Sequence, residues 1–171
     1  MNEAAFRDAY RQHKDVLYRF ARRMTGSSAA AEDIVQESFL ALWRSPSAYD
    51  PARGGLRSFL LGVTRNLALQ RLRRDRPHEE LNEDVSIAGP IDMLGLERAE
   101  ILARAVAALP PLQRETLILA EYEEMSLDEI GRATGVELAA VKSRLHRARE
   151  NLRRMLAPLL ETKGTAHGTN G

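Results

Sequence analysis

The sequence predicts an all-α protein made of two small helical domains joined by an acidic flexible linker. Three observations lead to this prediction. Leu and Ala dominate the apolar residues, whereas aromatic residues make up only 5% of the 171 residues, a composition that favours helices. Apolar side chains recur every three or four positions along most of the chain, which is the period of an amphipathic helix. Residues 77–95 interrupt this pattern with Pro, Gly and acidic residues, as is typical of a linker.

The first predicted domain covers residues 1–76 and begins with two helices. The first helix carries Val16 and Phe20 and stops before Gly26, because Gly suits the C-terminus of a helix and the Ser residues that follow suit an N-cap. The two helices are therefore expected to form a hairpin. The second helix is expected to bury a stripe with the i, i+3, i+4, i+7 spacing: Ala31, Ile34, Val35, Ser38, Phe39 and Leu42.

A third helix is expected over residues 56–74, after a break at residues 45–55. The break contains two Pro and two Gly, which predict a loop without regular structure. The inner side of the third helix is expected to consist of six apolar residues: Leu56, Phe59, Leu60, Val63, Leu67 and Leu72.

The second predicted domain covers residues 96–158 and contains four helices. A capping box of Ser126 and Glu129 starts the third of them, and Gly135 ends it. The four expected ranges are 96–109, 112–124, 126–134 and about 136–156. The Gly- and Thr-rich tail, residues 159–171, is expected to be disordered.

The last two helices have the form of a helix-turn-helix, in which a short capped helix and a tight turn precede a longer basic helix. An apolar seam is expected to hold the two helices at a steep angle: Leu127, Ile130, Val136, Val141 and Leu145. This arrangement would leave polar and basic side chains free to enter a DNA major groove: Lys142, Ser143, Arg144, His146 and Arg147. An ordinary helical hairpin with a cationic surface is the alternative interpretation.

The net charge of +1 conceals three segments of opposite sign. Residues 51–76 contain seven Arg and one Asp, a balance of +6, and residues 77–100 contain seven acidic residues and one Arg, a balance of −6. Residues 137–154 contain six basic and two acidic residues, a balance of +4. Two basic helices separated by an acidic connector suit contact with DNA phosphates at two points. For each segment taken alone, a solvated helix face is the alternative.

Several functional classes are disfavoured by what the sequence lacks. It contains no Cys and only four His, with no HExxH motif, so a disulfide framework, a thiol nucleophile and a cysteine-ligated metal site are excluded. We therefore expect no metal, no cofactor and no catalytic residues. The charged N-terminus lacks the apolar region of a secretory signal, and no apolar stretch approaches the roughly 20 residues of a membrane span. We expect a cytoplasmic protein without membrane insertion.

Three features of the first domain indicate binding rather than catalysis. Residues 31–43 have an acidic and amide-bearing face, which suits either a basic protein partner or plain solvation. The loop at residues 49–55 joins an aromatic, an acidic and an Arg side chain on a Gly-rich backbone. Such a loop suits an unstacked base, although an ordinary turn is the alternative. Asn66 follows in the Arg-rich helix, and its amide can both donate and accept at a base edge.

Three segments, in this order, resemble the bacterial extracytoplasmic-function (group IV, sigma-70 family) RNA polymerase sigma factors. They are AEDIVQESFLALW, YDPARGGLRSFLLGVTRNLALQRLRR and LPPLQRETLILAEYEEMSLDEIGRATGVELAAVKSRLHRARENLRRML. The resemblance covers residues 5–156. It implies that residues 1–76 form sigma region 2, that residues 77–95 form the linker, and that residues 96–158 form sigma region 4.

The resemblance also implies a role for particular residues. The helix over residues 31–43 would dock on the clamp coiled coil of the polymerase β′ subunit through Asp33, Gln36, Glu37 and Trp43. The loop at residues 49–55 and the helix after it would capture a flipped-out base and bind the minus-10 element through Tyr49, Asp50, Arg53, Arg65, Asn66, Arg71 and Arg73. The recognition helix would read the minus-35 element through Lys142, Ser143, Arg144, His146 and Arg147.

Further partners follow from the same resemblance. Region 4 would contact the polymerase β flap through its apolar face, and the acidic linker would run through a basic channel of the enzyme as a nucleic-acid mimic. An anti-sigma factor would hold the two domains together. The main alternative is a sigma-like decoy that binds an anti-sigma factor without driving transcription, but the basic residues and Asn66 that such a decoy need not keep are all present. A free-standing helix-turn-helix repressor would leave the docking helix and the 49–55 loop unexplained.

Overall fold

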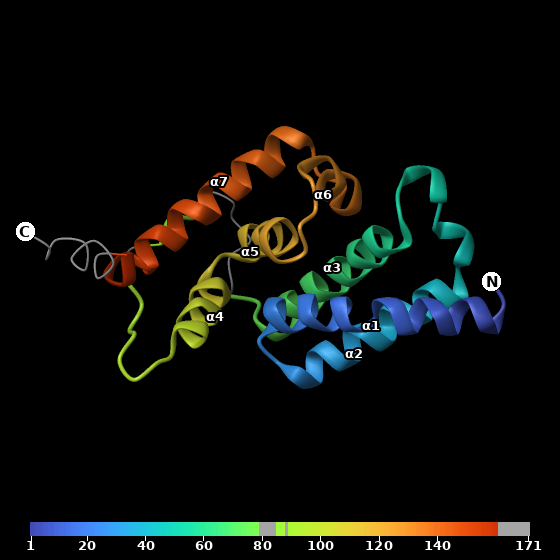
Figure 1. Ribbon diagram of the computed structural model, residues 1–171, viewed down its shortest axis with the longest axis horizontal. Coiled ribbons are helices and arrows are strands. Elements are labelled where there is room, and N and C mark those ends of the chain that lie inside the picture. Colours follow the sequence, from blue (N-terminus) through green and yellow to red (C-terminus); the bar gives the residue numbers. More distant parts are fainter. Residues whose placement is uncertain (79–84, 88, 161–171) are drawn as a thin grey trace, which may run out of the picture.

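The computed structural model describes residues 1–78, 85–87 and 89–160. Within these ranges every regular element is helical, as the sequence predicts. Three helices form the N-terminal half and four form the C-terminal half, and the two halves lie against each other (Figure 1). Among the described helices, none combines the length and the apolar character that a membrane span needs.

The N-terminal half is a bundle of α1 (Glu3–Thr25), α2 (Ser28–Arg44) and α3 (Leu56–Asp75). The hairpin between α1 and α2 is confirmed, because Gly26 adopts a left-handed φ of 71° and the Ser27 side chain accepts a hydrogen bond from the start of α2. All six residues of the predicted α2 stripe are buried. They pack against Leu17 and Phe20 of α1, both of which are fully buried.

The predicted inner side of α3 is partly wrong. The residues that are buried are Leu60, Leu61, Gly62, Thr64, Ala68, Leu69 and Leu72. Leu56, Phe59, Val63 and Leu67 are only half-buried. The reason is that α3 has two sets of neighbours, because α1 and α2 cover one side and a helix of the C-terminal half covers another. The innermost side also contains a polar pair, in which the hydroxyls of Ser38 and Thr64 lie 2.8 Å apart.

The loop at residues 45–55 is more regular than its composition predicts. It contains two 3₁₀ turns, η1 (Pro46–Ala48) and η2 (Pro51–Arg53). Each turn begins at a Pro, whose fixed φ suits the first residue of a helical turn. The Asp50 carboxylate accepts a hydrogen bond from the backbone N–H of Ala52 at 3.0 Å and so caps the second turn.

The C-terminal half contains α4 (Arg98–Ala108), α5 (Pro111–Leu117), α6 (Leu127–Thr134) and α7 (Leu138–Met155). The single helix expected over residues 112–124 is instead α5 followed by a π-helical turn, η3 (Ile118–Tyr122). The N–H of Glu123 accordingly donates to the carbonyl of Ile118, five residues back, at 3.1 Å. Glu123 is thereby buried, although it is an acidic residue at the end of a helix.

The helix-turn-helix of α6 and α7 is confirmed. The Ser126 hydroxyl accepts from the Glu129 N–H at 3.1 Å, and the Glu129 side chain accepts from the Ser126 N–H, so the capping box is complete. Gly135 ends α6 with a left-handed φ of 72°. The predicted seam also forms, with Ile130, Val141 and Leu145 buried and the other two residues packed against them.

We expect Ser126→Ala to lower the free energy of unfolding of the C-terminal half by about 1 kcal/mol, the usual cost of losing an N-cap oxygen. Urea denaturation followed by circular dichroism measures this loss. Ser47→Ala, which removes a hydroxyl from an exposed residue of η1, is the matched control and should change stability by less than about 0.5 kcal/mol. Equal effects of the two substitutions would contradict the role of the cap.

The predicted linker is held on the C-terminal half where it is described. The Ile87 N–H donates to Asn151 Oδ1 at 2.9 Å, and the Val85 carbonyl accepts from the side-chain amides of both Asn151 and Gln113 at 3.1 Å. The expected flexibility of residues 79–84 and 88 lies outside the described residues, as does the expected disorder of residues 161–171. Residues 159 and 160, assigned to the disordered tail, continue a helical turn instead.

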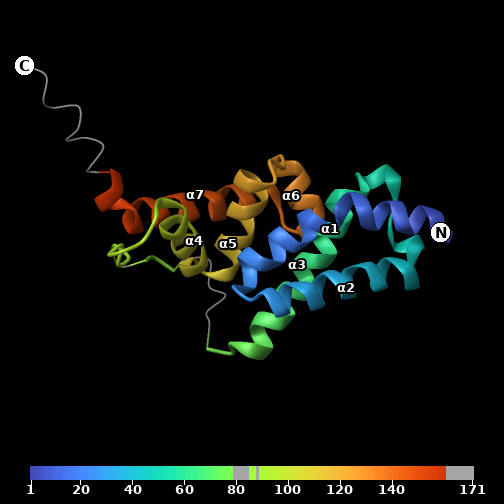
Figure 2. The same ribbon diagram turned by 60° about the horizontal axis from the view of Figure 1, so that its bottom comes forward.

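The two halves meet where α6 lies across α3 and where α1 contacts α4, α5 and η3 (Figures 1 and 2). The backbones of α3 and α6 approach each other closely at Gly62. A Cβ atom at this position would lie 2.4 Å from the Ala133 carbonyl oxygen of α6. Only glycine therefore allows the two backbones to approach this closely.

Candidate polymerase and nucleic-acid interfaces

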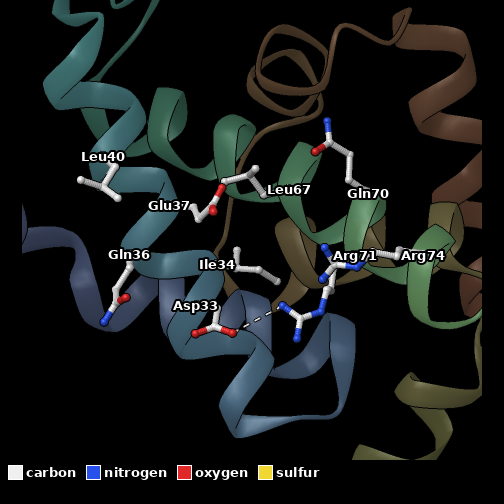
Figure 3. Close-up of a pocket in the computed structure, with 9 residues that line it drawn as sticks. All are labelled: Asp33, Ile34, Gln36, Glu37, Leu40, Leu67, Gln70, Arg71 and Arg74. Carbon is white, nitrogen blue, oxygen red and sulfur yellow. Dashed lines mark ion pairs between the residues drawn. The ribbon is translucent and has the colours of Figure 1, made fainter.

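A groove of about 580 Å³ runs between α2 and α3 and contains three of the four residues predicted to dock on polymerase (Figure 3). Asp33, Gln36 and Glu37 lie on one exposed face of α2, and Leu40 continues this face with 44% of its surface exposed. Residues of α3 form the opposite wall: Leu67, Gln70, Arg71 and Arg74. The groove therefore presents acidic, basic and apolar groups side by side.

Trp43, the fourth predicted docking residue, does not line this groove. Its ring packs edge-on against Phe6 of α1, with the ring centroids 5.0 Å apart, and Phe6 in turn contacts Phe39. Trp43 nevertheless remains 48% exposed. Trp43 thus extends the exposed surface of α2 into an aromatic cluster with α1.

Arg71 lies away from the other residues predicted to bind the minus-10 element. Its guanidinium is 3.6 Å from the Asp33 carboxylate across the α2–α3 groove, and its Nε donates to Asp75 at 2.7 Å. This hydrogen bond lowers the pKa of Asp75 and raises that of Arg71. The structure therefore groups Arg71 with the predicted docking residues, because it lies on a different face of α3 from Asn66.

The 49–55 loop and Asn66 border a second groove, of about 780 Å³, whose opposite wall is α6. The Tyr49 ring packs against Phe59 with the centroids 5.4 Å apart, and its hydroxyl donates to the Gly54 carbonyl at 3.3 Å. Asn66 is exposed to this groove, where its Oδ1 accepts from Arg65 at 3.1 Å. Arg53 lines the same groove, whereas Arg73 is exposed elsewhere on α3.

Arg65 is almost fully enclosed between the two halves. Its Nε and one terminal nitrogen donate to the two oxygens of Glu115 at 2.5 and 2.7 Å, a bidentate pair. The side chain of Arg65 is 12% exposed and that of Glu115 is 1% exposed. Burial raises the pKa of the Glu115 carboxyl, and the neighbouring Arg65 and Arg144 oppose that shift. Arg65 thus binds a carboxylate of the C-terminal half in this arrangement.

The predicted recognition helix divides into outward and inward residues. Lys142 and His146 of α7 are exposed, and Ser143 and Arg147 are half-buried. The expectation that Arg144 is free to enter a major groove is wrong for this conformation, because Arg144 is buried and its guanidinium lies 3.7 Å from Glu115. Helical spacing already indicated this position, because Arg144 follows the buried Val141 by three residues and precedes the buried Ala148 by four.

Sequence reasoning missed the buried charges between the two halves. Glu123 is enclosed by three Arg of the N-terminal half, of which Arg57 is the nearest at 2.8 Å. Arg114 of α5 is buried and donates to the Met24 carbonyl at the end of α1 at 2.5 Å. Nothing in the local sequence marks these residues as buried, because their partners lie far away along the chain. The short helix α5, PLQRETL, gave no apolar stripe against which Arg114 and Glu115 would stand out, because Gln113 and Thr116 are polar too.

The two halves match two family models, one after the other along the chain. The model for the family described as "Sigma-70 region 2" matches residues 9–77, and the model described as "Sigma-70, region 4" matches residues 99–152. The N-terminal half is thus region 2 and the C-terminal half is region 4. A structure of the sigma factor RpoE in complex with the anti-sigma factor NepR from Bartonella quintana is similar in fold, with a TM-score of 0.70, 22% identity and coverage of 90% of this chain and 97% of that one.

Relatives of known function are similar over most of this chain. SigE of Mycolicibacterium smegmatis is 37% identical over 159 residues, which cover 86% of this chain but 60% of SigE. SigL of Mycobacterium tuberculosis is 31% identical, with 94% of this chain and 93% of SigL covered. SigW of Bacillus subtilis is 29% identical, with 92% of each chain covered. All three are described as ECF RNA polymerase sigma factors. The chain therefore belongs to the extracytoplasmic-function family of RNA polymerase sigma factors.

Proposed function

We propose that this chain is an alternative sigma factor that binds core RNA polymerase and directs it to a specific set of promoters. The observation that supports this function best is the joint match to sigma region 2 and sigma region 4, in order, within one chain. Each region also has a cationic helix, α3 and α7 respectively, as binding to two separate promoter elements requires. The chain would act in the cytoplasm, without catalysis of its own and without a cofactor.

Polymerase docking is assigned to the exposed face of α2. Asp33, Gln36 and Glu37 offer carboxylate and amide oxygens next to the apolar Leu40. Such a mixture suits a protein partner with complementary basic residues and an apolar centre. Trp43 adds a large, partly exposed aromatic surface, of the kind that contributes much of the binding energy in protein interfaces.

Promoter binding is assigned to two surfaces. Tyr49, Asp50, Arg53 and Asn66 border one groove and combine an aromatic ring with groups that can hydrogen-bond to an unstacked base. Lys142 and His146 lie exposed on α7, the second helix of the helix-turn-helix. Arg65, Arg71, Arg73, Ser143, Arg144 and Arg147 complete the proposed set. Arg65 would have to release Glu115 of the C-terminal half to bind DNA, and Arg144 would have to release the same carboxylate within its own half.

Regulation by an anti-sigma factor is part of this proposal. The similar solved structures include a sigma factor bound to its anti-sigma factor, and CnrH bound to the cytosolic domain of CnrY (TM-score 0.66, 25% identity, coverage of 94% of this chain and 90% of that one). The exposed α2–α3 groove and the described linker are surfaces that such a partner could reach.

Run-off transcription tests this function directly. Purified bacterial core polymerase is incubated with a pooled promoter library, with and without this protein. We expect transcripts that depend on the protein and share two spaced upstream elements. Binding to core polymerase without transcripts from any promoter would support the decoy alternative. Failure to bind core polymerase would overturn the sigma-factor function itself.

Substitutions then test the residue assignments on a promoter found in this way. We expect Lys142→Ala to weaken binding of the holoenzyme to the upstream element by about tenfold or less, as for loss of one contact worth about 1 kcal/mol. The matched control is Lys14→Ala, at an exposed residue of α1. Asn66→Ala should mainly slow promoter opening, measured by the lag before the first transcript. Unchanged promoter binding in Lys142→Ala together with an unchanged lag in Asn66→Ala would contradict the proposed roles of these two residues.

A further inference from the structure

A pair of buried amide side chains in region 4 binds the main chain of the linker. Gln113 of α5 is 0% exposed and Asn151 of α7 is 2% exposed, and the Asn151 Nδ2 donates to Gln113 Oε1 at 2.7 Å. The same Nδ2 and the Gln113 Nε2 each donate to the Val85 carbonyl at 3.1 Å. The Asn151 Oδ1 accepts from the Ile87 N–H at 2.9 Å. Three of the four polar atoms of this pair therefore contact linker backbone.

The contacts with the linker follow its backbone at alternate residues. Asn151 engages the carbonyl of Val85 and the N–H of Ile87, two groups that point to the same side of an extended chain. The side chains of these two linker residues are half-buried, and that of Ile87 packs against the core. The N–H of Ile91 adds a contact with the Met155 carbonyl of α7 at 3.4 Å. Main-chain hydrogen bonds combined with alternate side-chain contacts are typical of sites that bind extended peptides.

The two amides hold each other in position independently of the linker. Gln113 and Asn151 lie on different helices, α5 and α7, which pack together within region 4. The hydrogen bond between the two side chains fixes the direction of each amide group. A side chain that is already ordered loses less conformational entropy on binding than a mobile one. The pair therefore has the properties of a preorganised site for an extended main chain.

This site shortens the part of the chain that joins the two regions. On the side of region 2, the Arg76 guanidinium donates to the Thr25 carbonyl at 2.8 Å. On the side of region 4, the chain is held from Val85, so that residues 77–84 lie between the two held positions. The nine steps from residue 76 to residue 85 can span at most about 30–32 Å. Without the site, thirteen more residues up to Arg98, where α4 begins, would add about 43–47 Å.

We propose that Gln113 and Asn151 form a binding site for extended main chain that holds residues 85–87 as an internal ligand and thereby limits how far apart the two regions can bind on promoter DNA. This inference rests on the binding to two promoter elements proposed above. Each base pair between the elements adds about 3.4 Å along the duplex, so the span of the short connection corresponds to about nine base pairs. A site outside the proposed DNA contacts then sets the longest spacing that the protein tolerates.

Ile87→Pro removes the contact from the side of the linker. Proline has no N–H to donate to Asn151, and residue 87 lies outside the helices of the described chain, so region 4 should remain folded. Ile87→Val is the matched control, because it keeps both the N–H and an apolar side chain. Asn151→Ala removes the same contact from the side of region 4 and leaves the sequence of the linker unchanged.

Hydrogen–deuterium exchange of the full chain reports whether the segment is held. We expect the Ile91 N–H to exchange about tenfold faster in Ile87→Pro and Asn151→Ala, because exchange of a bonded N–H requires local opening. Exchange in Ile87→Val should match that of the unsubstituted chain. A circular dichroism melt of each variant confirms that region 4 is folded. Unchanged exchange in both variants would overturn the binding site.

Run-off transcription from promoters whose spacer is lengthened one base pair at a time reports the limit on spacing. The longest spacer that supports transcription should increase by about two base pairs or more, about 7 Å, in Ile87→Pro and Asn151→Ala, and stay the same in Ile87→Val. Faster exchange with an unchanged longest spacer would overturn the limit on spacing. If the unsubstituted chain drives no transcription at any spacing, the sigma-factor function itself fails, whereas hydrogen exchange still decides whether the binding site exists.

Discussion

Glu115→Gln is expected to separate the two regions and to lower the melting temperature of the intact chain. The substitution keeps the shape of the side chain but removes the charge that Arg65 and Arg144 share. Removing one partner of a buried ion pair costs about 3–5 kcal/mol when the remaining charge stays buried. Here the two regions can separate, which exposes the Arg65 guanidinium to water and avoids that cost. The loss of the ion pair should therefore appear first as separation of the regions.

The matched control for Glu115→Gln is Glu150→Gln on α7. Glu150 pairs with Arg153 at 2.6 Å, but the two side chains are 41% and 65% exposed. Exposed pairs of this kind contribute about 0–1 kcal/mol. Differential scanning calorimetry and small-angle scattering together measure stability and separation. Equal changes in melting temperature and in separation for the two substitutions would show that the buried Glu115 does not hold the two regions together.

Leu17→Ala is expected to cause the largest loss of stability within region 2. Leu17 of α1 is fully buried in the core that α1, α2 and α3 share. Truncating a buried Leu to Ala costs about 2–5 kcal/mol, which includes both lost transfer energy and the cavity that remains. For a unit of this size each kcal/mol lowers the melting temperature by about 4–8 °C. Region 2 of this variant should therefore melt well below region 4.

Leu40→Ala makes the same chemical change on α2, where the side chain is 44% exposed. Its effect on stability should stay within about 0.5 kcal/mol, as for most surface substitutions. Thermal denaturation of the two variants under identical conditions gives the comparison. If Leu40→Ala destabilised the chain as much as Leu17→Ala, the burial of Leu17 in the core of α1, α2 and α3 would not account for its effect.

The nearly neutral net charge has a structural explanation in this molecule. The acidic residues that compensate for the basic helices lie partly at the boundary between the regions, where Glu115 and Glu123 face arginines of region 2. Partial burial of opposite charges makes their attraction stronger than on an open surface. Among these arginines, Arg65 is the one proposed to bind promoter DNA. Glu115 and the proposed promoter contact would therefore compete for the positive charge of Arg65.

Local features of the chain were predictable from the sequence. The hairpin at Gly26, the capping box of Ser126 and Glu129, and the buried stripe of α2 all follow from interactions between residues within about four positions of each other. The seam between α6 and α7 was predictable for the same reason, because only a short turn separates the two helices. The resemblance to sigma factors rests on contiguous segments of the chain, residues 31–43, 49–74 and 109–156.

The tertiary structure alone decided how the charged residues are used. Arg65 and Glu115 are 50 positions apart, and no periodic pattern indicates that two such residues will pair. Arg71 follows Asn66 by five positions, which places it about 140° away around α3, but only the packing of α2 and α6 against this helix decides which groove each residue faces. Helix formation depends on neighbouring residues, and the sequence by itself determined the helices and the family. Pairing of buried charges depends on which helices pack together, and only the folded chain determined that Arg65 and Arg144 converge on one carboxylate.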